Sequence, residues 1–248
     1  QLHDSKFTLY QSRAFFLSPH EIAVGDTVLS SGSFILATGS RPSEVSIPGL
    51  AQAGYFTSDT ILDLRTQPSS LIVLGGGAVA LELGQFFARL GTKVTMLQRG
   101  ATLLSDMDRD VGRAIEAALI EEGIEIVTDA QWLRTTFDAT GKTVWVMRDG
   151  SERPYVGAEI LQALGRQPNI EGLHLDRAGV TVDGGRIALG GGESTEPQPG
   201  LAWGGGEGGT HHRYILMEDG MVGAPTTKPH GVAGGVVDNQ RVDVGVVT

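Results

Sequence analysis

A glycine-rich turn between an apolar run and an amphipathic segment limits the possible folds of this chain more than any other feature. Residues 71–74 are continuously apolar, as in a parallel strand covered on both faces. The following six residues, GGGAVA at 75–80, satisfy the pattern G-x-G-x-x-G/A. Residues 78–90 then carry apolar side chains at helical spacing, and Gly91 stands where a helix is expected to end. This order predicts the start of a dinucleotide-binding βαβ unit.

Each small residue of the turn has a physical role in that prediction. The first glycine permits the tight turn, the third lets the backbone approach a pyrophosphate, and the alanine allows the helix to pack closely on the sheet. The helix N-terminus adds unpaired N–H groups and a partial positive charge. A glycine turn that binds nothing is the alternative, and the flanking strands and helix disfavour it. The predicted pyrophosphate-binding residues are Gly75, Gly76, Gly77, Ala78, Val79 and Ala80.

The end of the next β-run, Lys93–Leu97, bears on the choice of cofactor. An NAD-binding protein places Asp or Glu there, about 20 residues after the motif, to bind the ribose hydroxyls. This chain has Gln98 and Arg99 instead. A carboxylate would repel a 2'-phosphate, whereas a guanidinium can pair with it bidentately. We therefore predict NADP(H) rather than NAD(H), with a solvated surface arginine as the alternative.

The rest of the pattern predicts an α/β fold with a parallel sheet and right-handed crossovers. An antiparallel meander and a strand at 33–39 precede a Pro-rich, linker-like stretch. A β-hairpin is predicted around Asp149-Gly150, and irregular backbone is expected at 190–209. The predicted strands are 7–10, 14–17, 21–24, 27–29, 33–39, 71–74, 93–97, 124–127, 143–148, 151–156 and 159–164, and the predicted helices are 78–90 and 110–122.

Composition excludes several classes of function. The formal net charge of -10 argues against a nucleic-acid or anionic-membrane surface. The absence of cysteine excludes a disulfide scaffold, a thiolate metal site and cysteine redox chemistry on this chain. The sequence has no apolar run of about 18 residues or signal peptide, so we expect a cytoplasmic protein.

A few polar and aromatic residues outside the glycine turn are also candidates for chemistry. Glu82 lies one turn into the predicted helix and, taken alone, would be a solvated charge. The charged run at 106–110 predicts an exposed helix start without a catalytic role. His211-His212 lacks further ligands at metal-binding spacing, so no metal site is predicted. Trp203 has no assigned role.

Three landmarks in order carry a resemblance to a known family. They are ATGSRP at 37–42, the glycine turn through Glu82, and LGRQPN at 164–169. With these landmarks, residues 7–189 resemble the flavoprotein disulfide reductases with two dinucleotide cofactors, which include dihydrolipoamide dehydrogenase, glutathione reductase and mercuric reductase. Residues 80–95, the pair Gln98-Arg99 and residues 55–58 are most similar to mercuric reductases.

The resemblance implies roles for individual residues. Glu82 would lie beside the nicotinamide and the flavin, Arg99 would read the 2'-phosphate, and Thr38 and Gly39 would lie near FAD. Gly165, in the later turn, joins the predicted cofactor-binding residues. Electrons would pass from NADPH to FAD, then to a redox cysteine pair and to the substrate, Hg(II), which would become Hg(0). The parent protein would be a homodimer.

The resemblance also implies a division into domains and some departures from the family. A Rossmann-like NAD(P)-binding βαβ domain, 67–166, would be inserted in a partial FAD-binding domain formed by 1–66 and 167–248. The redox cysteines are absent, the later turn reads Ala163-Leu164-Gly165, and residues 199–207 lack the family's flavin-binding Asp.

We therefore expect an internal piece of a longer oxidoreductase. It should bind NADP(H), hold FAD weakly or not at all, and perform no complete turnover. A dihydrolipoamide dehydrogenase-like fragment and a non-catalytic NADPH-binding module are the alternatives.

Overall fold

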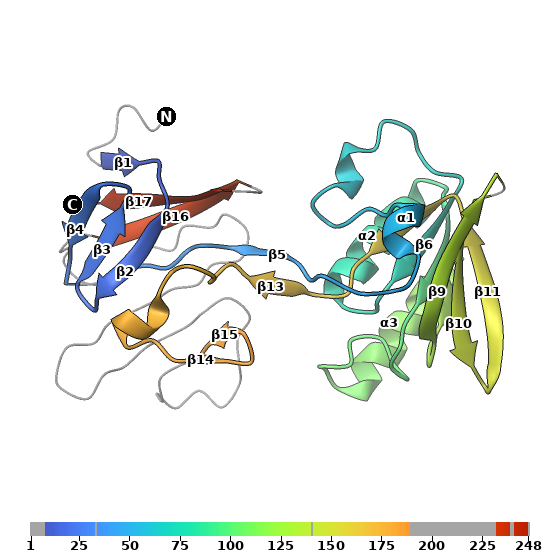
Figure 1. Ribbon diagram of the computed structural model, residues 1–248. Helices are drawn as coiled ribbons and strands as arrows, with labels where there is room; N and C mark the ends of the chain where they lie inside the picture. The colour runs from blue at the N-terminus through green and yellow to red at the C-terminus, as the bar shows by residue number, and fades with distance from the viewer. Residues whose placement is uncertain (1–7, 33, 140, 189–231, 239–240, 248) are drawn as a thin grey trace. The chain divides into compact units, whose positions relative to one another are not determined.

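The computed structural model describes residues 8–32, 34–139, 141–188, 232–238 and 241–247 (Figure 1). The chain forms two compact units. Unit 1 contains 1–41 and 167–248, and unit 2 contains 42–166. Unit 2 is therefore continuous in sequence and separates the two segments of unit 1. The predicted α/β class with a parallel sheet is confirmed.

The parallel sheet of unit 2 has the strand order β12-β6-β7-β8. All three pairings are parallel. β6 lies inside the sheet with a partner on each side, which explains why its sequence is continuously apolar. The strands are β6 (Ser70–Leu74), β7 (Lys93–Leu97), β8 (Glu125–Val127) and β12 (Glu159–Gln162), with the helices α2 (Ala78–Arg89) and α3 (Arg109–Glu121) between them in sequence.

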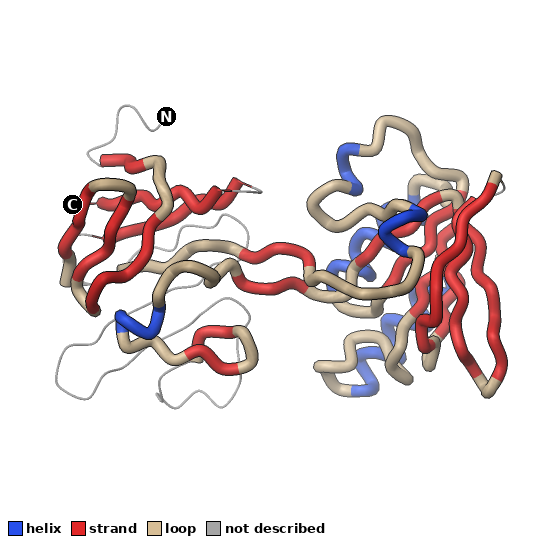
Figure 2. The backbone as a smooth tube through the Cα atoms, in the orientation of Figure 1, coloured by secondary structure: helices blue, strands red, loops and turns tan. Residues whose placement is uncertain are grey.

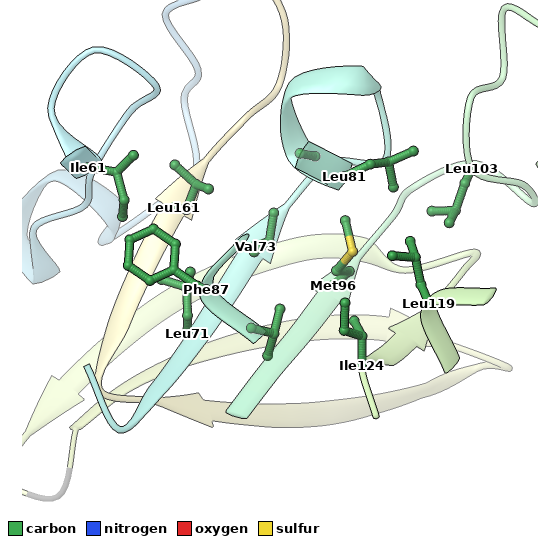
Figure 3. Packing of buried hydrophobic residues seen from close by; sticks show 12 residues of the cluster. Ile61, Leu71, Val73, Leu81, Phe87, Met96, Leu103, Leu119, Ile124 and Leu161 are labelled. Atoms are coloured by element: carbon green, nitrogen blue, oxygen red, sulfur yellow. The ribbon is translucent and has the colours of Figure 1, made fainter. Parts of the chain in front are cut away.

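Alternating side chains of β6 form two separate cores. Leu71 and Val73 join a cluster with residues of α2 and α3 (Figure 3). Ile72 and Leu74 join a second cluster on the opposite face, together with residues of an antiparallel sheet. That sheet contains β9 (Gln131–Asp138), β10 (Gly141–Arg148) and β11 (Ser151–Gly157), in the order β11-β10-β9. Helices thus cover one face of the parallel sheet, and β-structure covers the other.

The hairpin prediction is confirmed, because β10 and β11 pair directly around residues 149–150. Asp149 and Gly150 have φ values of 51° and 72°, as the tight primed turn requires. β9 was not predicted. Its sequence, QWLRTTFD, lacks a clean alternation of apolar and polar residues, so hydrophobic periodicity does not indicate a strand there.

The stretch before β6 was predicted to be linker-like, and this prediction is wrong. The stretch packs into the cores of unit 2. It contains α1 (Leu50–Ala53) and a 3₁₀ turn, η2 (Ile61–Asp63). Leu50 and Ile61 are 1% and 0% exposed and belong to the two cores. The boundaries predicted for the NAD(P)-binding domain, between 66 and 67 and between 166 and 167, remain a prediction.

Unit 1 contains the predicted meander, formed by β2 (Ala14–Ser18), β3 (Glu21–Val24) and β4 (Thr27–Ser30) (Figure 2). The first predicted strand is not part of it. β1 (Thr8–Tyr10) pairs instead with β17 (Arg241–Val247), which also pairs with β16 (Val232–Asp238). Unit 1 also contains η3 (Leu175–Ala178), β14 (Val182–Asp183) and β15 (Arg186–Ile187).

The strand predicted at 33–39 is wrong for the described residues 34–39, which form no ladder. Phe34 and Leu36 are still buried in the core of unit 1, so the apolar run reflects burial without strand pairing. Pairing begins with β5 (Ser40–Pro42), whose partner is β13 (Arg166–Pro168). Ser33, the segment 190–209 with Trp203, and His211-His212 lie outside the described residues.

A matched pair of leucines in unit 2 tests the core on the helix side. Leu161 is fully buried, whereas Leu62 is 66% exposed. Leu161→Ala should lower the free energy of unfolding by about 2–5 kcal/mol, because it removes buried methyl groups and leaves a cavity. Leu62→Ala should change it by less than about 0.5 kcal/mol. Urea unfolding of both variants checks this, and equal losses would contradict the assigned core.

Candidate functional site

Gly75 begins the turn at the carboxyl end of β6, and its geometry requires glycine. Its φ is 120°, a region that residues with a β-carbon rarely adopt. A β-carbon there would also overlap the carbonyl oxygen of Ala163. The Gly75 N–H donates to the Leu97 carbonyl at 2.9 Å, so the turn is tied to the end of the neighbouring strand.

Gly76 is the residue whose structural role the sequence motif did not specify. A β-carbon on it would lie 2.9 Å from Cδ2 of Leu103 and 3.0 Å from Cδ of Gln98. Its carbonyl accepts a hydrogen bond from the Leu104 N–H at 2.8 Å. Gly76 therefore lets the loop after β7 pack directly on the turn.

Gly77 has the opposite environment, because it faces open space. It is exposed, and a β-carbon on it would meet nothing within 4 Å. It is the N-cap of α2, and no side chain caps the helix there. The Leu81 N–H donates to the Gly77 carbonyl, which starts the helical pattern, so the first N–H groups of α2 have no intrahelical partner. This exposed backbone is a cradle that an anion can enter.

Ala80 lies at the third small position and is fully buried in the core beside β6. A larger side chain would push α2 away from the sheet. The residue types that the motif requires thus correspond to a strained turn, an open cradle and a close helix contact.

Gln98 and Arg99 lie at the same edge of the sheet, after β7. The Gln98 side chain packs beneath Gly76, and its Nε2 donates to the Thr102 carbonyl at 3.2 Å. Arg99 is exposed, and its guanidinium carbon lies 5.7 Å from the centroid of the Trp132 ring. Because the carboxyl ends of parallel strands share one edge, the glycine turn and this pair meet at the position where dinucleotides bind in such sheets.

Glu82 is exposed on the second turn of α2, four residues after Ala78. The far end of the same helix is held by an ion pair, in which Arg89 and Glu122 approach to 2.6 Å. The hydrogen bond from Arg89 lowers the pKa of the Glu122 carboxyl. This pair joins the C-terminal ends of α2 and α3 and leaves the N-terminal end of α2 open.

The two turns at 37–42 and 164–169 are hydrogen-bonded to each other. Nδ2 of Asn169 donates to the Thr38 carbonyl at 3.0 Å, and the Asn169 N–H donates to the Gly39 carbonyl at 3.0 Å. Arg41 donates to Oδ1 of Asn169 and pairs with Glu171 at 2.7 Å, and the hydrogen bond from Arg41 lowers the pKa of the Glu171 carboxyl. These contacts give a structural role to Arg41 in the first turn and to Asn169 in the second.

Thr38 and Gly165 occupy different environments within these turns. The Thr38 hydroxyl is buried and has no hydrogen-bond partner among the described residues. Such an orphan donor fits a polar group that the chain itself does not supply. Thr38 also lines a cavity of otherwise apolar character beside Phe16, Phe34 and Leu36. Gly39 and Gly165 have positive φ values of 65° and 102°.

The described residues include neither a metal site nor a membrane-spanning helix. No group of three His, Asp or Glu side chains among them could hold a metal ion. None of the described helices has the length and apolarity needed to cross a membrane.

Comparison with known proteins identifies the family. The sequence profile of the pyridine nucleotide-disulphide oxidoreductases matches residues 2–197. This chain belongs to that family. The resemblance predicted from the three landmarks is confirmed, and the family as a whole is one that binds FAD and a pyridine nucleotide.

Individual relatives carry two different names. A mercuric reductase of Lysinibacillus sphaericus is 37% identical over 179 residues, covering 72% of this chain and 33% of the relative. A dihydrolipoyl dehydrogenase of Thermus scotoductus is 36% identical over 187 residues, covering 73% of this chain and 40% of the relative. The chain thus spans roughly a third of the length of the mercuric reductases that it matches.

Solved structures agree with the family. The HOCl-induced flavoprotein disulfide reductase RclA of Escherichia coli superposes with a TM-score of 0.61 at 27% identity. The match covers 72% of this chain and 41% of that chain. A Cu(II) complex of the same reductase gives a TM-score of 0.60.

The different environments of two glycines in the turn give a test. Gly75→Ala should destabilise unit 2 by at least about 2 kcal/mol, because of its positive φ and the overlap with Ala163. Gly77→Ala should cost less than about 1 kcal/mol, since space is open there. It should nevertheless weaken binding of a dinucleotide by about tenfold, because the methyl group fills the cradle. Urea unfolding and calorimetric titration with NADPH measure the two effects. Undiminished binding by Gly77→Ala would contradict the site.

Proposed function

We propose that this chain is the NADPH-binding part of a flavin-dependent oxidoreductase. The observation that carries the proposal is the open backbone at Gly77, at the uncapped N-terminus of α2. Residues 75–80 would hold the pyrophosphate through backbone N–H groups. This mode of binding suits a chain with a formal charge of -10, because no cluster of basic side chains is needed.

The preference for NADPH over NADH rests on Arg99. It lies after β7, where the ribose of the adenosine half would be bound, and the described residues place no carboxylate within ion-pair distance of it. Its N–H donors are therefore available to a 2'-phosphate. Gln98 adds a neutral side chain where a carboxylate would repel that phosphate.

The remaining site residues are assigned to the nicotinamide end of NADPH or to FAD. NADPH, when bound, supplies the hydride, and the protein must orient its nicotinamide ring. Glu82 is exposed on the same helix that begins at the phosphate cradle, and we assign it to the nicotinamide end. Thr38 and Gly39 are assigned to FAD, which the Thr38 hydroxyl fits as an orphan polar group. Gly165, in unit 2, is proposed as a cofactor-binding residue.

For the whole protein, we propose a mercuric reductase, with Hg(II) as the electron acceptor and a homodimeric, cytoplasmic enzyme. Identity to mercuric reductases and the Gln98-Arg99 pair support this choice. The specific alternative is a dihydrolipoyl dehydrogenase-like enzyme, since the relative of that name from Thermus scotoductus is 36% identical. NADPH-dependent release of Hg(0) by the protein that carries this segment would support the first. NADH-dependent reduction of lipoamide would support the second.

A non-catalytic NADPH-binding module is the remaining candidate. The absence of cysteine from this chain favours it, because the chain has no thiol pair to accept electrons. Binding of NADPH without electron transfer to any acceptor by the protein that carries this segment would support it.

Arg99→Ala tests the cofactor preference. We expect NADPH to bind the unmodified chain at least about tenfold more tightly than NADH, or about 1.4 kcal/mol. The substitution should remove most of that difference by weakening NADPH alone, since NADH has no 2'-phosphate. Calorimetric titration of the purified chain with each cofactor measures both dissociation constants.

Arg153→Ala is the matched control, because Arg153 is also exposed and in unit 2 but lies on β11. It changes the net charge equally and should leave both affinities unchanged. An unaltered NADPH-to-NADH ratio in Arg99→Ala would refute the assigned role.

A further inference from the structure

We propose that Trp132, on β9, is a positioning residue that holds Arg99 ready for the 2'-phosphate of NADPH and thereby contributes to cofactor specificity. The inference rests on the proposed function of Arg99. It adds a residue from the antiparallel sheet, a part of unit 2 that the dinucleotide motif does not contain.

Backbone hydrogen bonds fix the approach of the two side chains. The Gln98 N–H donates to the Val127 carbonyl at 2.8 Å, and the Ala130 N–H donates to the Gln98 carbonyl at 3.0 Å. The Asp129 N–H donates to the Gly100 carbonyl at 3.1 Å. The segment after β8 therefore runs beside residues 98–100, and Trp132 follows it at the start of β9. These bonds hold the main chain at Arg99 close to the main chain that leads into Trp132.

The contact itself is a cation–π interaction. The guanidinium carbon of Arg99 lies 5.7 Å from the ring centroid, within the roughly 6 Å over which such pairs attract. Trp132 is half-buried and packs against the cluster beneath the antiparallel sheet, so the ring is anchored while Arg99 stays exposed.

An aromatic partner, unlike a carboxylate, leaves the N–H donors of an arginine available to a ligand. A carboxylate would occupy the N–H donors of the guanidinium and cancel its charge, whereas a ring face restrains the group without accepting those N–H bonds. Arg134 gives the contrast within the same sheet. It lies 4.6 Å from the Trp145 ring but also pairs with Glu152 at 2.8 Å. Arg99 has the aromatic contact without an ion pair among the described residues, so it can still bind a phosphate.

Restraint of Arg99 before binding should increase affinity, because a long side chain otherwise loses rotamer entropy when it captures the ligand. The benefit should apply to NADPH and not to NADH. This selectivity separates a positioning role from a general effect on folding, which would weaken both cofactors.

The test uses the full chain and calorimetric titration with NADPH and NADH. Trp132→Leu keeps apolar packing but removes the π face, and it should weaken NADPH about two- to fivefold with NADH unchanged. Trp132→Phe keeps a weaker ring face and should lose less, which also covers a failure of the leucine variant to fold. Trp145→Leu, the same substitution beside the ion-paired Arg134, should leave both affinities unchanged.

A double-mutant cycle decides whether Trp132 acts through Arg99. In the Arg99→Ala background, Trp132→Leu should have no further effect on NADPH affinity. An equal loss in both backgrounds, or a parallel loss of NADH affinity, would overturn the inference. Wild-type NADPH affinity in both Trp132→Leu and Trp132→Phe would also overturn it while leaving the role of Arg99 intact. Lack of any NADPH preference in the unmodified chain would refute the proposed function and this inference together.

Discussion

The backbone of Gly75 leaves β6 against the main chain that follows β12, with no room for a side chain between them. The rest of the site depends on this close approach. It allows the turn to be tied to the Leu97 carbonyl on one side, while the Ala163 N–H donates to the Leu74 carbonyl on the other. The turn is thus held between both neighbours of β6, and α2 starts from a fixed point at the edge of the sheet.

The small residues that follow Gly75 serve either packing or binding. Gly76 and Ala80 face protein, where the loop after β7 and the core beside β6 fill the space. Gly77 faces solvent with the uncapped start of a 12-residue helix behind it. A protein with excess negative charge can attract an anion at such a point because helix dipole and N–H groups act locally, whereas repulsion from distant surface carboxylates is screened by salt.

Sequence reasoning succeeded where one physical signal dominated. The signal is a continuous apolar run for β6, a helical period for α2, and a turn sequence for the hairpin at Asp149-Gly150. It failed where the decisive partner is distant. The packing of Leu103 on Gly76 and the contact of Trp132 with Arg99 join residues that no local pattern relates. At 34–39, an apolar run reflects burial of backbone that forms no ladder.

Mapping the amide groups that respond to NADPH is the most direct test of the central claim. In ¹H–¹⁵N spectra of the full chain, saturating NADPH should shift the signals of Gly77, Ala78 and Val79 most strongly, because their N–H groups would donate to the pyrophosphate. Signals of the antiparallel sheet away from Trp132 should move little. Unchanged amide signals at the start of α2, at NADPH concentrations that saturate binding elsewhere or at the highest concentration reached, would contradict the account.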